Sequence, residues 1–573
     1  MKNTKKITKK KFNKEKKKNN IKDRIINLIK KHQIISVYTC VFIIGMIFSL
    51  WLFKPGMIKG HDILYHLSRI KGLKDSILNG DIMAPIHVGL RGYEYANGLF
   101  YGNLLFYIPA IFRMLGLGLV NSYKVYVLFC TIASAFTMFW CMKGITKSNK
   151  AGLLGSFLYS ACSYKACDFI VRAAAGEMGA FIFLPLIVLG FYYIVYDDYK
   201  KWYIFTIGFV GLVQCHLIST ALIGVIIVLL ILINYERLFK EKNRIKSLII
   251  SGAVGLLISA YFIFPLLEGF AKNDLNLSQT SSFPSWNFTI PIEKIFLAYP
   301  YHSTKAFTPA GIGVLYIVLT GLRLKIKPSK DDKIIKFCDL SIIVAVISLL
   351  LITDFFPWKE IDVLRPIQFP WRFYLFASLF ITISSTITTY YYLKNKTKKD
   401  IIKFIIPVLV IAMIPSTITE YEYRRKANGK RLYKWNDFYV SNGEYLPLET
   451  DVNKLYKRGM VVTSNNENIK MEFSKKGNKV IVNYSDNEKE DTYIEIPLLY
   501  YYGYVALDED GKKLSISKGD NNIIRVNNIK NKKGTVKVFY KRTNIQKYSL
   551  WLSIISWIVL IVYLLKTRIK FKY

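Results

Sequence analysis

The sequence predicts a polytopic α-helical membrane protein that carries an all-β domain near its C-terminus. Hydrophobic residues make up 52% of the 573 residues, aromatic residues make up 15%, and the mean hydropathy is +0.25. This composition exceeds what the core of a soluble domain needs. Long apolar runs alternate with short basic loops, and the chain turns polar from about residue 420 to 548. The two patterns predict a membrane domain and a separate β-rich domain.

The formal net charge of +41 is explained by membrane topology, so we expect no nucleic-acid partner. Lysines gather in residues 1–32 and in short loops between apolar runs, as the positive-inside rule requires. We therefore expect a basic cytoplasmic tail at 1–32, cytoplasmic N- and C-termini, and contact with anionic lipids. The seven cysteines lie in or beside apolar runs without a CxxC pair, which predicts neither disulfides nor a thiolate metal site.

About twelve helices are predicted to cross the bilayer, because twelve apolar runs match its hydrocarbon thickness of about 30 Å. They lie near 33–53, 120–142, 151–167, 178–196, 202–216, 217–234, 247–267, 308–322, 337–353, 370–392, 402–418 and 549–565. With the N-terminus inside, alternation places the basic loops in the cytoplasm. Residues 99–119 are apolar too, but counting them as a span would move most of these loops outside. We interpret them as a re-entrant or interfacial helix within a large first outer loop, 54–120.

A polar region follows the membrane domain of 33–419. Between 420 and 548, short runs with alternating apolar residues, such as KVIVNYS and GTVKVFYK, are separated by Asn, Gly and Asp. This alternation is typical of antiparallel strands, so we expect an extracytoplasmic β-sandwich-like domain. A final span and a basic cytoplasmic tail at 549–573 follow it. The tyrosine-rich stretch 500–504 could stack on sugar rings, with core packing as the alternative.

The first cluster of ionisable residues lies in GHDILYHLSRIKGL (60–73), just after the first span. On a helix that begins near Asp62, His66 falls at i+4 and Arg69 at i+7, so the three share one face. Such a cluster at a membrane surface is a candidate site. Alternatively, Asp62 lies in the first turn of an interfacial helix, where the helix dipole favours a negative charge, and Arg69 reaches the lipid headgroups. A loosely spaced metal site of His61, Asp62 and His66 is a further alternative.

The second cluster lies in DFIVRAAAGEMGAFIFLPL, at a boundary that the topology places on the same outer face. It contains Asp168, Arg172 and Glu177. A carboxylate beside a membrane helix is costly unless it has a partner or a function. Arg172 and Glu177 could simply neutralise one another. Because both clusters are predicted on one face, we favour a single shared site.

Two further segments supply candidates. His216 lies at a tight turn between two spans, where a histidine either packs by hydrogen bonding or takes part in a site. The segment LRPIQFPWRF contributes Arg365, Gln368, Trp371 and Arg372 just before a span. These arginines and the glutamine could clamp a phosphate through bidentate donors. The alternative is that Arg372 and Trp371 anchor the helix at the membrane interface.

These residues carry a resemblance to a known family. GHDILYHLSRIKGLKDSILNGD, NGLFYGNLLFYIPAIF, RAAAGEMGAFIFLPL and QFPWRF, in this order, resemble bacterial membrane proteins named 6-pyruvoyl-tetrahydropterin synthase-related, which are close to the YfhO-like group. The chain has no histidine triad matching the soluble pterin synthases. More distantly, the plan is similar to the GT-C glycosyltransferases, which have many spans, a large first outer loop with an acidic residue near its start, and often a C-terminal outer domain.

The resemblance implies a glycosyltransferase in the bacterial cell membrane that moves a sugar from a polyprenyl-phosphate donor to a cell-envelope acceptor on the outer face. Asp62 matches the GT-C acidic residue and would be the general base. Glu177 would be a second catalytic or orienting carboxylate. Substrate and phosphate binding would fall to His66, Arg69, Arg172, His216, Gln368 and Arg372, with the arginines ranked in the order Arg69, Arg172, Arg372.

The resemblance leaves the cofactor open, because the loop begins with His61-Asp62 and not with an acidic pair. A single aspartate suffices for a metal-free mechanism, and a divalent metal ion remains the alternative. Two other function classes stay open. A lipid or polysaccharide transporter or flippase would also have a dozen spans, although it usually shows two similar halves and polar residues at the midplane. A non-catalytic scaffold that presents the β-domain would tolerate replacement of Asp62.

Overall fold

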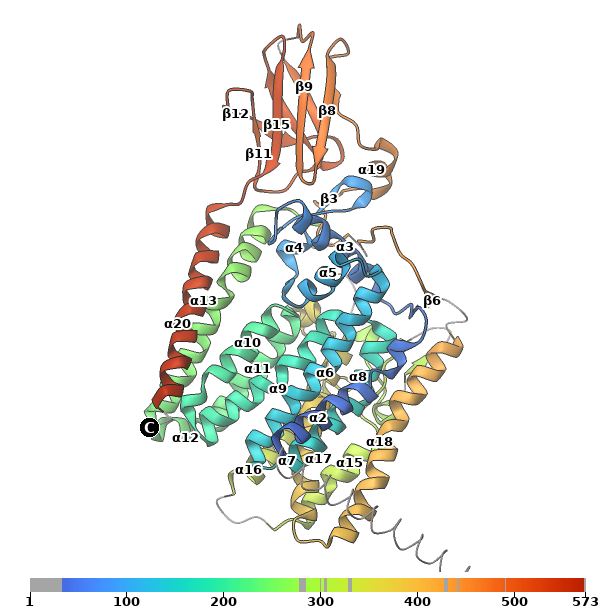
Figure 1. The fold of residues 1–573 in the computed structure, drawn as a ribbon, viewed down its shortest axis with the longest axis vertical. Helices are drawn as coiled ribbons and strands as arrows, with labels where there is room; N and C mark the ends of the chain where they lie inside the picture. Colours follow the sequence, from blue (N-terminus) through green and yellow to red (C-terminus); the bar gives the residue numbers. More distant parts are fainter. Residues whose placement is uncertain are drawn as a thin grey trace, which may run out of the picture.

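The computed structural model describes residues 33–277, 285–298, 300–302, 307–327, 332–426, 431–440, 443–489 and 491–570. A bundle of helices carries two β-sheets at one end, and the C-terminal helix α20 runs from the sheets to the opposite end (Figure 1). The helical class and a C-terminal β-sheet region are therefore confirmed. The predicted basic tail, 1–32, lies outside the described residues.

The helices follow the apolar runs of the sequence. The α-helices are α2 (Gln33–Ile47), α3 (Ile63–Leu78), α4 (Asn97–Phe100), α5 (Tyr107–Met114), α6 (Leu119–Thr146), α7 (Asn149–Ala161), α8 (Ser163–Ala166), α9 (Ala175–Tyr196), α10 (Tyr203–Val213), α11 (Leu217–Ile233), α12 (Tyr235–Lys240), α13 (Lys242–Lys272), α15 (Val314–Gly321), α16 (Lys333–Leu350), α17 (Phe373–Leu393), α18 (Lys398–Lys426), α19 (Val452–Arg458) and α20 (Asn544–Lys570). Short turns of other helix types include η1 (Leu50–Phe53), η3 (Leu104–Phe106), η4 (Cys167–Arg172), η9 (Asp362–Ile367) and η10 (Pro370–Arg372).

The predicted count of twelve spans is not confirmed. Among the described residues, six helices are long and apolar enough to cross a membrane: Leu119–Thr146, Ala175–Tyr196, Lys242–Lys272, Pro370–Leu393, Lys398–Tyr423 and Asn544–Thr567. The predicted span 202–216 instead contains the 11-residue helix α10, and 308–322 contains the 8-residue helix α15. At 1.5 Å per residue these helices are about 16 Å and 12 Å long, well short of the hydrocarbon thickness.

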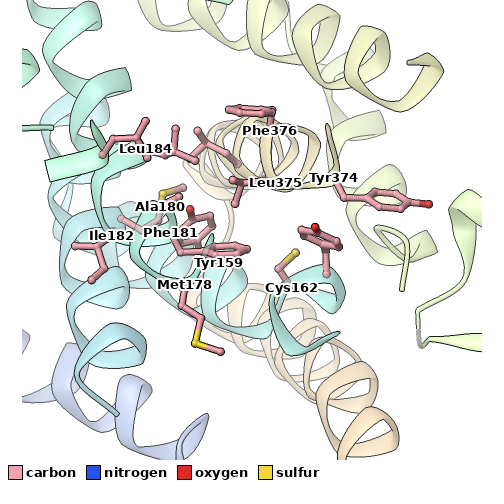
Figure 2. Packing of buried hydrophobic residues seen from close by; sticks show 14 of the residues in the cluster. Tyr159, Cys162, Met178, Ala180, Phe181, Ile182, Leu184, Tyr374, Leu375 and Phe376 are labelled. Carbon is pink, nitrogen blue, oxygen red and sulfur yellow. The ribbon is translucent and has the colours of Figure 1, made fainter. Parts of the chain in front are cut away.

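Two helices form the centre of the bundle, and two others lie at its edge. Of the most apolar stretch of each helix, 89% is buried in α9 and 94% in α17, against 17% in both α18 and α20. Figure 2 shows the packing at the centre, where Phe181 of α9 and Leu375 of α17 lie close to Tyr159 of α7. The exposed apolar residues of α18 and α20 are therefore the surface that lipid would cover.

Two antiparallel sheets form the β-rich region. One has the order β13-β14-β10-β7 and the other the order β12-β11-β15-β9-β8. Their bounds are β7 (Thr463–Ser464), β8 (Lys470–Lys476), β9 (Lys479–Ser485), β10 (Thr492–Leu499), β11 (Tyr504–Leu507), β12 (Lys513–Leu514), β13 (Ile516–Lys518), β14 (Ile523–Ile529) and β15 (Gly534–Tyr540). Val482 of β9 and Val538 of β15 share one buried cluster with Ile496 of β10, so the inner faces of the two sheets enclose a common core.

The loop after α2 lies between the sheets and the bundle (Figure 1). Its short strands are β1 (Met57–Ile58), β2 (His87–Val88) and β3 (Glu94–Tyr95). β1 pairs with β6 (Arg431–Leu432), and β2 pairs with β3. Another two-stranded hairpin joins β4 (Tyr301–His302) to β5 (Phe307–Thr308). Residues 99–119, predicted to be re-entrant or interfacial, form the end of α4, the turn η3 and the 8-residue helix α5, which is about 12 Å long.

Candidate active site

The loop after α2 and the η4 turn are joined by their backbones. The amide of His61 donates to the carbonyl of Val171 at 3.0 Å, and the amide of Asp62 donates to the carbonyl of Arg172 at 2.9 Å. Gly60 permits this approach, because a Cβ atom there would lie 2.6 Å from Cβ of Ala173. The two ionisable clusters predicted from the sequence therefore meet where α3 begins.

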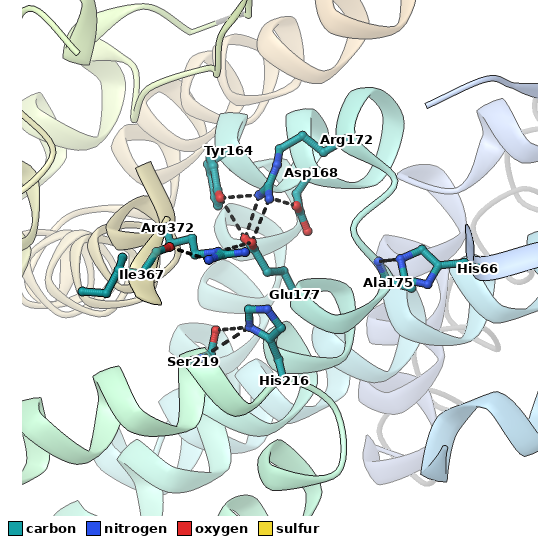
Figure 3. A network of polar contacts seen from close by, with 10 residues as sticks. All are labelled: His66, Tyr164, Asp168, Arg172, Ala175, Glu177, His216, Ser219, Ile367 and Arg372. Atoms are coloured by element: carbon teal, nitrogen blue, oxygen red, sulfur yellow. Dashed lines mark hydrogen bonds and ion pairs between the residues drawn. The ribbon is translucent and has the colours of Figure 1, made fainter. Parts of the chain in front are cut away.

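Arg172 is the centre of a buried polar network (Figure 3). Its Nη1 and Nη2 donate to Oε2 and Oε1 of Glu177, each at 2.9 Å, which is a bidentate ion pair. Nη1 also donates to Oδ1 of Asp168 at 2.9 Å and to the hydroxyl of Tyr164 at 2.8 Å. The Tyr164 hydroxyl in turn donates to Oε2 of Glu177 at 2.8 Å. All four residues are buried, so their polar groups must form hydrogen bonds and ion pairs with one another instead of with water.

The local fold explains why these side chains converge. η4 is a π-helical turn, a type that often occurs at functional sites. It ends at Ala173, whose φ of 54° lies in the left-handed region. The chain then starts α9 at Ala175, which puts Glu177 in the first turn, where the helix dipole favours a negative charge.

Arg372 adds a second cation that is less fully bonded. Its Nε lies 3.6 Å from Oε1 of Glu177, and Nη1 donates to the carbonyl of Ile367. Nε is buried and makes no hydrogen bond within the described part of the chain. The predicted partner Gln368 is half-buried, and its φ of 62° is a strained backbone conformation for a residue other than glycine. Arg365 is exposed and pairs with Asp362 at 2.8 Å, so it is not part of the network.

Asp62 differs from the acidic residues of the network, Asp168 and Glu177, because its carboxylate forms no hydrogen bond or ion pair with the residues that the structure describes. It occupies the N-cap position of α3, yet its side chain accepts no capping hydrogen bond. The residue keeps contact with solvent even though protein surrounds it on most sides. This desolvation raises the pKa of Asp62 above its ordinary value, while Arg172 acts in the opposite direction. Asp62 is thus an accessible carboxylate in the electrostatic field of the network.

His66 and Arg69 have other contacts, although they lie on the same helix. Nε2 of His66 accepts from the amide of Ala175 at 3.2 Å, and burial lowers the pKa of His66 well below its usual range, so the ring stays neutral. Nη2 of Arg69 donates to the carbonyl of Gly102 at 2.7 Å. The guanidinium lies 4.2 Å and 3.7 Å from two aromatic ring centroids, those of Tyr101 and Phe106. Arg69 therefore ties α3 to the loop that follows it.

His216 lies next to the network on the other side of Glu177 (Figure 3). Its Nδ1 is 2.8 Å from Oγ of Ser219, and it caps the first turn of α11. The Tyr101 hydroxyl and the His216 ring both pack against Gly176. A Cβ atom on Gly176 would lie 2.5 Å from the Tyr101 hydroxyl and 2.9 Å from Cδ2 of His216. Burial raises the pKa of Tyr101 to about 12, so its hydroxyl stays protonated.

Tyr164 is a network residue that was not among those predicted from the sequence. A usable signal was present, since Tyr164, Asp168 and Arg172 follow one another at intervals of four residues and so share a helix face. In the described ranges, no group of three or more His, Cys, Asp or Glu residues is arranged to hold a metal ion. The His66 nitrogen nearest to α9 is already used by Ala175.

Comparisons with known proteins extend over most of the chain. A family model described as bacterial membrane protein YfhO matches residues 95–431; the pterin-synthase-related name is not shown. An uncharacterized protein of Lactococcus lactis subsp. cremoris (strain MG1363) is 23% identical over 600 residues, which cover 93% of this chain and 96% of that protein.

Solved structures show weaker likeness. A cryo-EM structure of the mycobacterial arabinofuranosyltransferase AftD is 12% identical with a TM-score of 0.40, covering 67% of this chain and 27% of AftD. A mutant form of AftD is 10% identical with a TM-score of 0.41, covering 67% of this chain and 28% of AftD. The oligosaccharyltransferase of Archaeoglobus fulgidus, tethered to an acceptor peptide, is 12% identical with a TM-score of 0.36, covering 72% of this chain and 56% of that enzyme.

Proposed function

The chain belongs to the YfhO family of bacterial membrane proteins, and we propose that it is a membrane glycosyltransferase of GT-C type. It transfers a sugar from a polyprenyl-phosphate donor to a cell-envelope acceptor on the outer face of the membrane. Both termini are cytoplasmic and the β-sheets stand outside the cell in this proposal. The observation that carries it is the accessible, uncapped carboxylate of Asp62 next to the buried network of Arg172, Glu177 and Arg372.

Asp62 serves as the general base in the proposed reaction. The acceptor hydroxyl attacks the anomeric carbon of the donor sugar, and its proton passes to the Asp62 carboxylate. The bond between the anomeric carbon and the phosphate oxygen breaks, and polyprenyl phosphate leaves with the bonding electron pair. The raised pKa of Asp62 suits this role, because a base is most effective when its pKa approaches the operating pH.

Arg372 is the preferred cation for the departing phosphate. Arg172 already gives its donors to Asp168, Glu177 and Tyr164. Arg69 also has a buried Nε and Nη1 without hydrogen-bond partners among the described residues, but two aromatic rings and a loop carbonyl enclose its guanidinium. Arg372 has a buried Nε without a hydrogen-bond partner in the described structure. This Nε can donate to a phosphate oxygen without breaking an existing hydrogen bond. We therefore place Arg372 first as the phosphate-binding arginine, whereas the ranking from sequence placed Arg69 first.

An apolar groove beside Arg372 supports a lipid-linked donor. A cavity of about 610 Å³ lies between α11, α16 and α17, and Ile367 and Phe373, on either side of Arg372 in the chain, line one part of it. The remaining lining is almost entirely aliphatic or aromatic, with Ser348 as its polar exception. A polyprenyl chain in this groove would bring its phosphate to the guanidinium of Arg372.

A reconstituted transfer assay tests the proposal. The purified protein in lipid vesicles receives polyprenyl-phosphate sugars and cell-envelope acceptors, and release of polyprenyl phosphate is measured. We expect Asp62→Asn to reduce the rate by roughly 10² to 10⁴-fold, the usual contribution of a general base. The matched control is Asp75→Asn on the same helix, where Asp75 pairs with Lys74 at 2.8 Å away from the network.

The control must keep the wild-type rate while both variants stay equally folded. Equal rates for wild type and Asp62→Asn would remove Asp62 from the mechanism. Movement of an intact lipid-linked sugar across the vesicle membrane without transfer would instead identify a flippase.

A further inference from the structure

A second charged pocket lies on the far side of η4 from the candidate active site. Lys165 of α8 has only 2% of its surface exposed. Its Nζ donates to Oγ of Ser134 at 2.7 Å, and it forms no ion pair within the described part of the chain. An ammonium group carries three donors, and a buried cation without a counter-ion is costly at membrane depth. This lysine is therefore an electrostatic feature that the proposed reaction does not use.

Aromatic rings stabilise part of this charge. Three ring centroids lie 5.4 to 5.7 Å from Nζ, those of Tyr159, Phe169 and Phe181. Cation and ring interactions at this distance are favourable but do not replace an anion. The site therefore still lacks a negative partner.

A cavity beside Lys165 offers room for that partner. It has a volume of about 190 Å³ and is lined by Lys165 together with four hydroxyl side chains, Thr131, Ser160, Ser416 and Thr417. The Ser160 hydroxyl has no hydrogen-bond partner among the described residues, whereas those of Thr131, Ser416 and Thr417 donate to backbone carbonyls. The ammonium group and the Ser160 hydroxyl are therefore the donors suited to phosphate oxygens. Glu420 at the edge of the cavity is a carboxylate, but Lys54 pairs with it at 2.9 Å.

The remaining walls of the cavity are apolar. They include Phe48 and Trp51, from the segment that follows α2, and Met413 of α18. α18 is mostly exposed on its apolar surface, so this side of the protein is the side that faces lipid. Hydrophobic walls next to a cation fit an amphiphile better than a small ion, because both parts of the ligand then find a matching surface.

We propose that this pocket binds the phosphate headgroup of an anionic membrane lipid, with Lys165 as its cation and the lipid chains between α2 and α18. The shared chemistry is that of a phosphate anion, and the lipid is the source that the apolar walls favour. Phe169 and Ile170 of η4 line this pocket, whereas Asp168 and Arg172 of the same turn belong to the active-site network. The lipid therefore contacts the segment that positions the network.

Binding is tested on the purified full-length protein in detergent. Phosphatidylglycerol, phosphatidylcholine and inorganic phosphate are added separately, and native mass spectrometry and thermal unfolding report binding. We expect phosphatidylglycerol to bind and to raise the Tm, and Lys165→Met to weaken its binding by roughly tenfold or more. Lys165→Arg should retain part of the binding.

Two further variants keep the test decisive. Ser416→Phe narrows the cavity from α18 without touching the lysine, and it should reduce binding even if Lys165→Met folds poorly. The control Lys124→Met removes a different outer-side lysine, one that donates to the carbonyl of Lys54, and it should bind as wild type does. Equal binding by wild type, Lys165→Met and Ser416→Phe would overturn the proposal. A response to inorganic phosphate but not to phosphatidylglycerol would overturn the assignment to lipid.

Discussion

Two buried glutamates in this protein have different surroundings. Glu94 joins the loop after α2 to the β-sheets. Lys475 Nζ donates to its Oε1 at 2.5 Å, and the amide of Leu499 donates to its Oε2 at 3.0 Å. Glu177 joins η4 to α9 through Arg172, but a second cation, Arg372, lies only loosely beside it, and an accessible carboxylate, Asp62, lies nearby.

The difference shows what separates a structural charge from a candidate site. Burial raises the pKa of Glu94 above its ordinary value, and Lys475 opposes this shift. The pKa values of Glu94 and Asp62 are therefore shifted in the same direction and for the same reason. Both oxygens of Glu94 nonetheless have partners, and solvent does not reach them. A perturbed acid marks a site only when it can also be reached and is not already satisfied.

The largest expected effect comes from removing Arg172, the centre of the buried polar network at the candidate site. Arg172→Met leaves Asp168 and Glu177 buried without their shared cation. Breaking a buried ion pair in this way costs about 3 to 5 kcal/mol, so we expect a large loss of stability together with loss of activity. Unfolding in detergent followed by circular dichroism measures the change. An unfolding midpoint equal to wild type would show that the network is not needed for the fold.

A smaller effect is expected at the other glutamate. Lys475→Met removes the cation from Glu94 but leaves the amide of Leu499 in place. We expect a loss of about 1.5 to 3 kcal/mol, the range for hydrogen bonds to charged groups. Limited proteolysis should then cut the polypeptide faster near the β-sheets, while activity per folded molecule stays at the wild-type level. A selective loss of activity without faster cutting would contradict the structural role assigned to Glu94.

The smallest effect concerns the pH dependence of Asp62. Its folded-state pKa is raised, so the folded protein holds this proton more tightly than the unfolded chain does. The resulting stability is complete below the unfolded pKa of about 4 and is lost as the pH rises through the folded pKa. Asp62→Asn does not titrate, so the stability of wild type relative to this variant should fall with increasing pH. A difference that does not change with pH would argue against a raised pKa.

The sequence predicted the helical class, the β-rich region and the identity of most network residues. Apolar runs and loop charge carried the first prediction, and the alternation of apolar residues carried the second, because both patterns are local in the sequence. The count of twelve spans is not confirmed, because some of the predicted runs contain only a short helix, such as α10 with 11 residues and α15 with 8 residues. The hydropathy of a run does not reveal how long the helix within it is.

Helix spacing was less informative about side-chain contacts. It placed Asp62, His66 and Arg69 on one face. In the structure, however, His66 bonds to the amide of Ala175 and Arg69 to the carbonyl of Gly102, while the Asp62 side chain makes no capping hydrogen bond. The pairing of residues 61–62 with 171–172 is a long-range contact, which the local spacing does not encode.

The tyrosine-rich stretch 500–504 had two interpretations, stacking on sugar rings and core packing. Tyr501 and Tyr504 are buried, whereas Tyr502 is 41% exposed, so core packing explains the first two.

In the proposed mechanism, the accessible Asp62 carboxylate and the incompletely bonded Arg372 together form the reaction site. A cryo-EM structure of the protein with polyprenyl phosphate bound is the decisive experiment. We expect density for the phosphate at the guanidinium of Arg372, within reach of Asp62, and density for the lipid chain in the groove between α11 and α16. Phosphate density at Arg69, or at a position remote from both Arg372 and Asp62, would rule out this site.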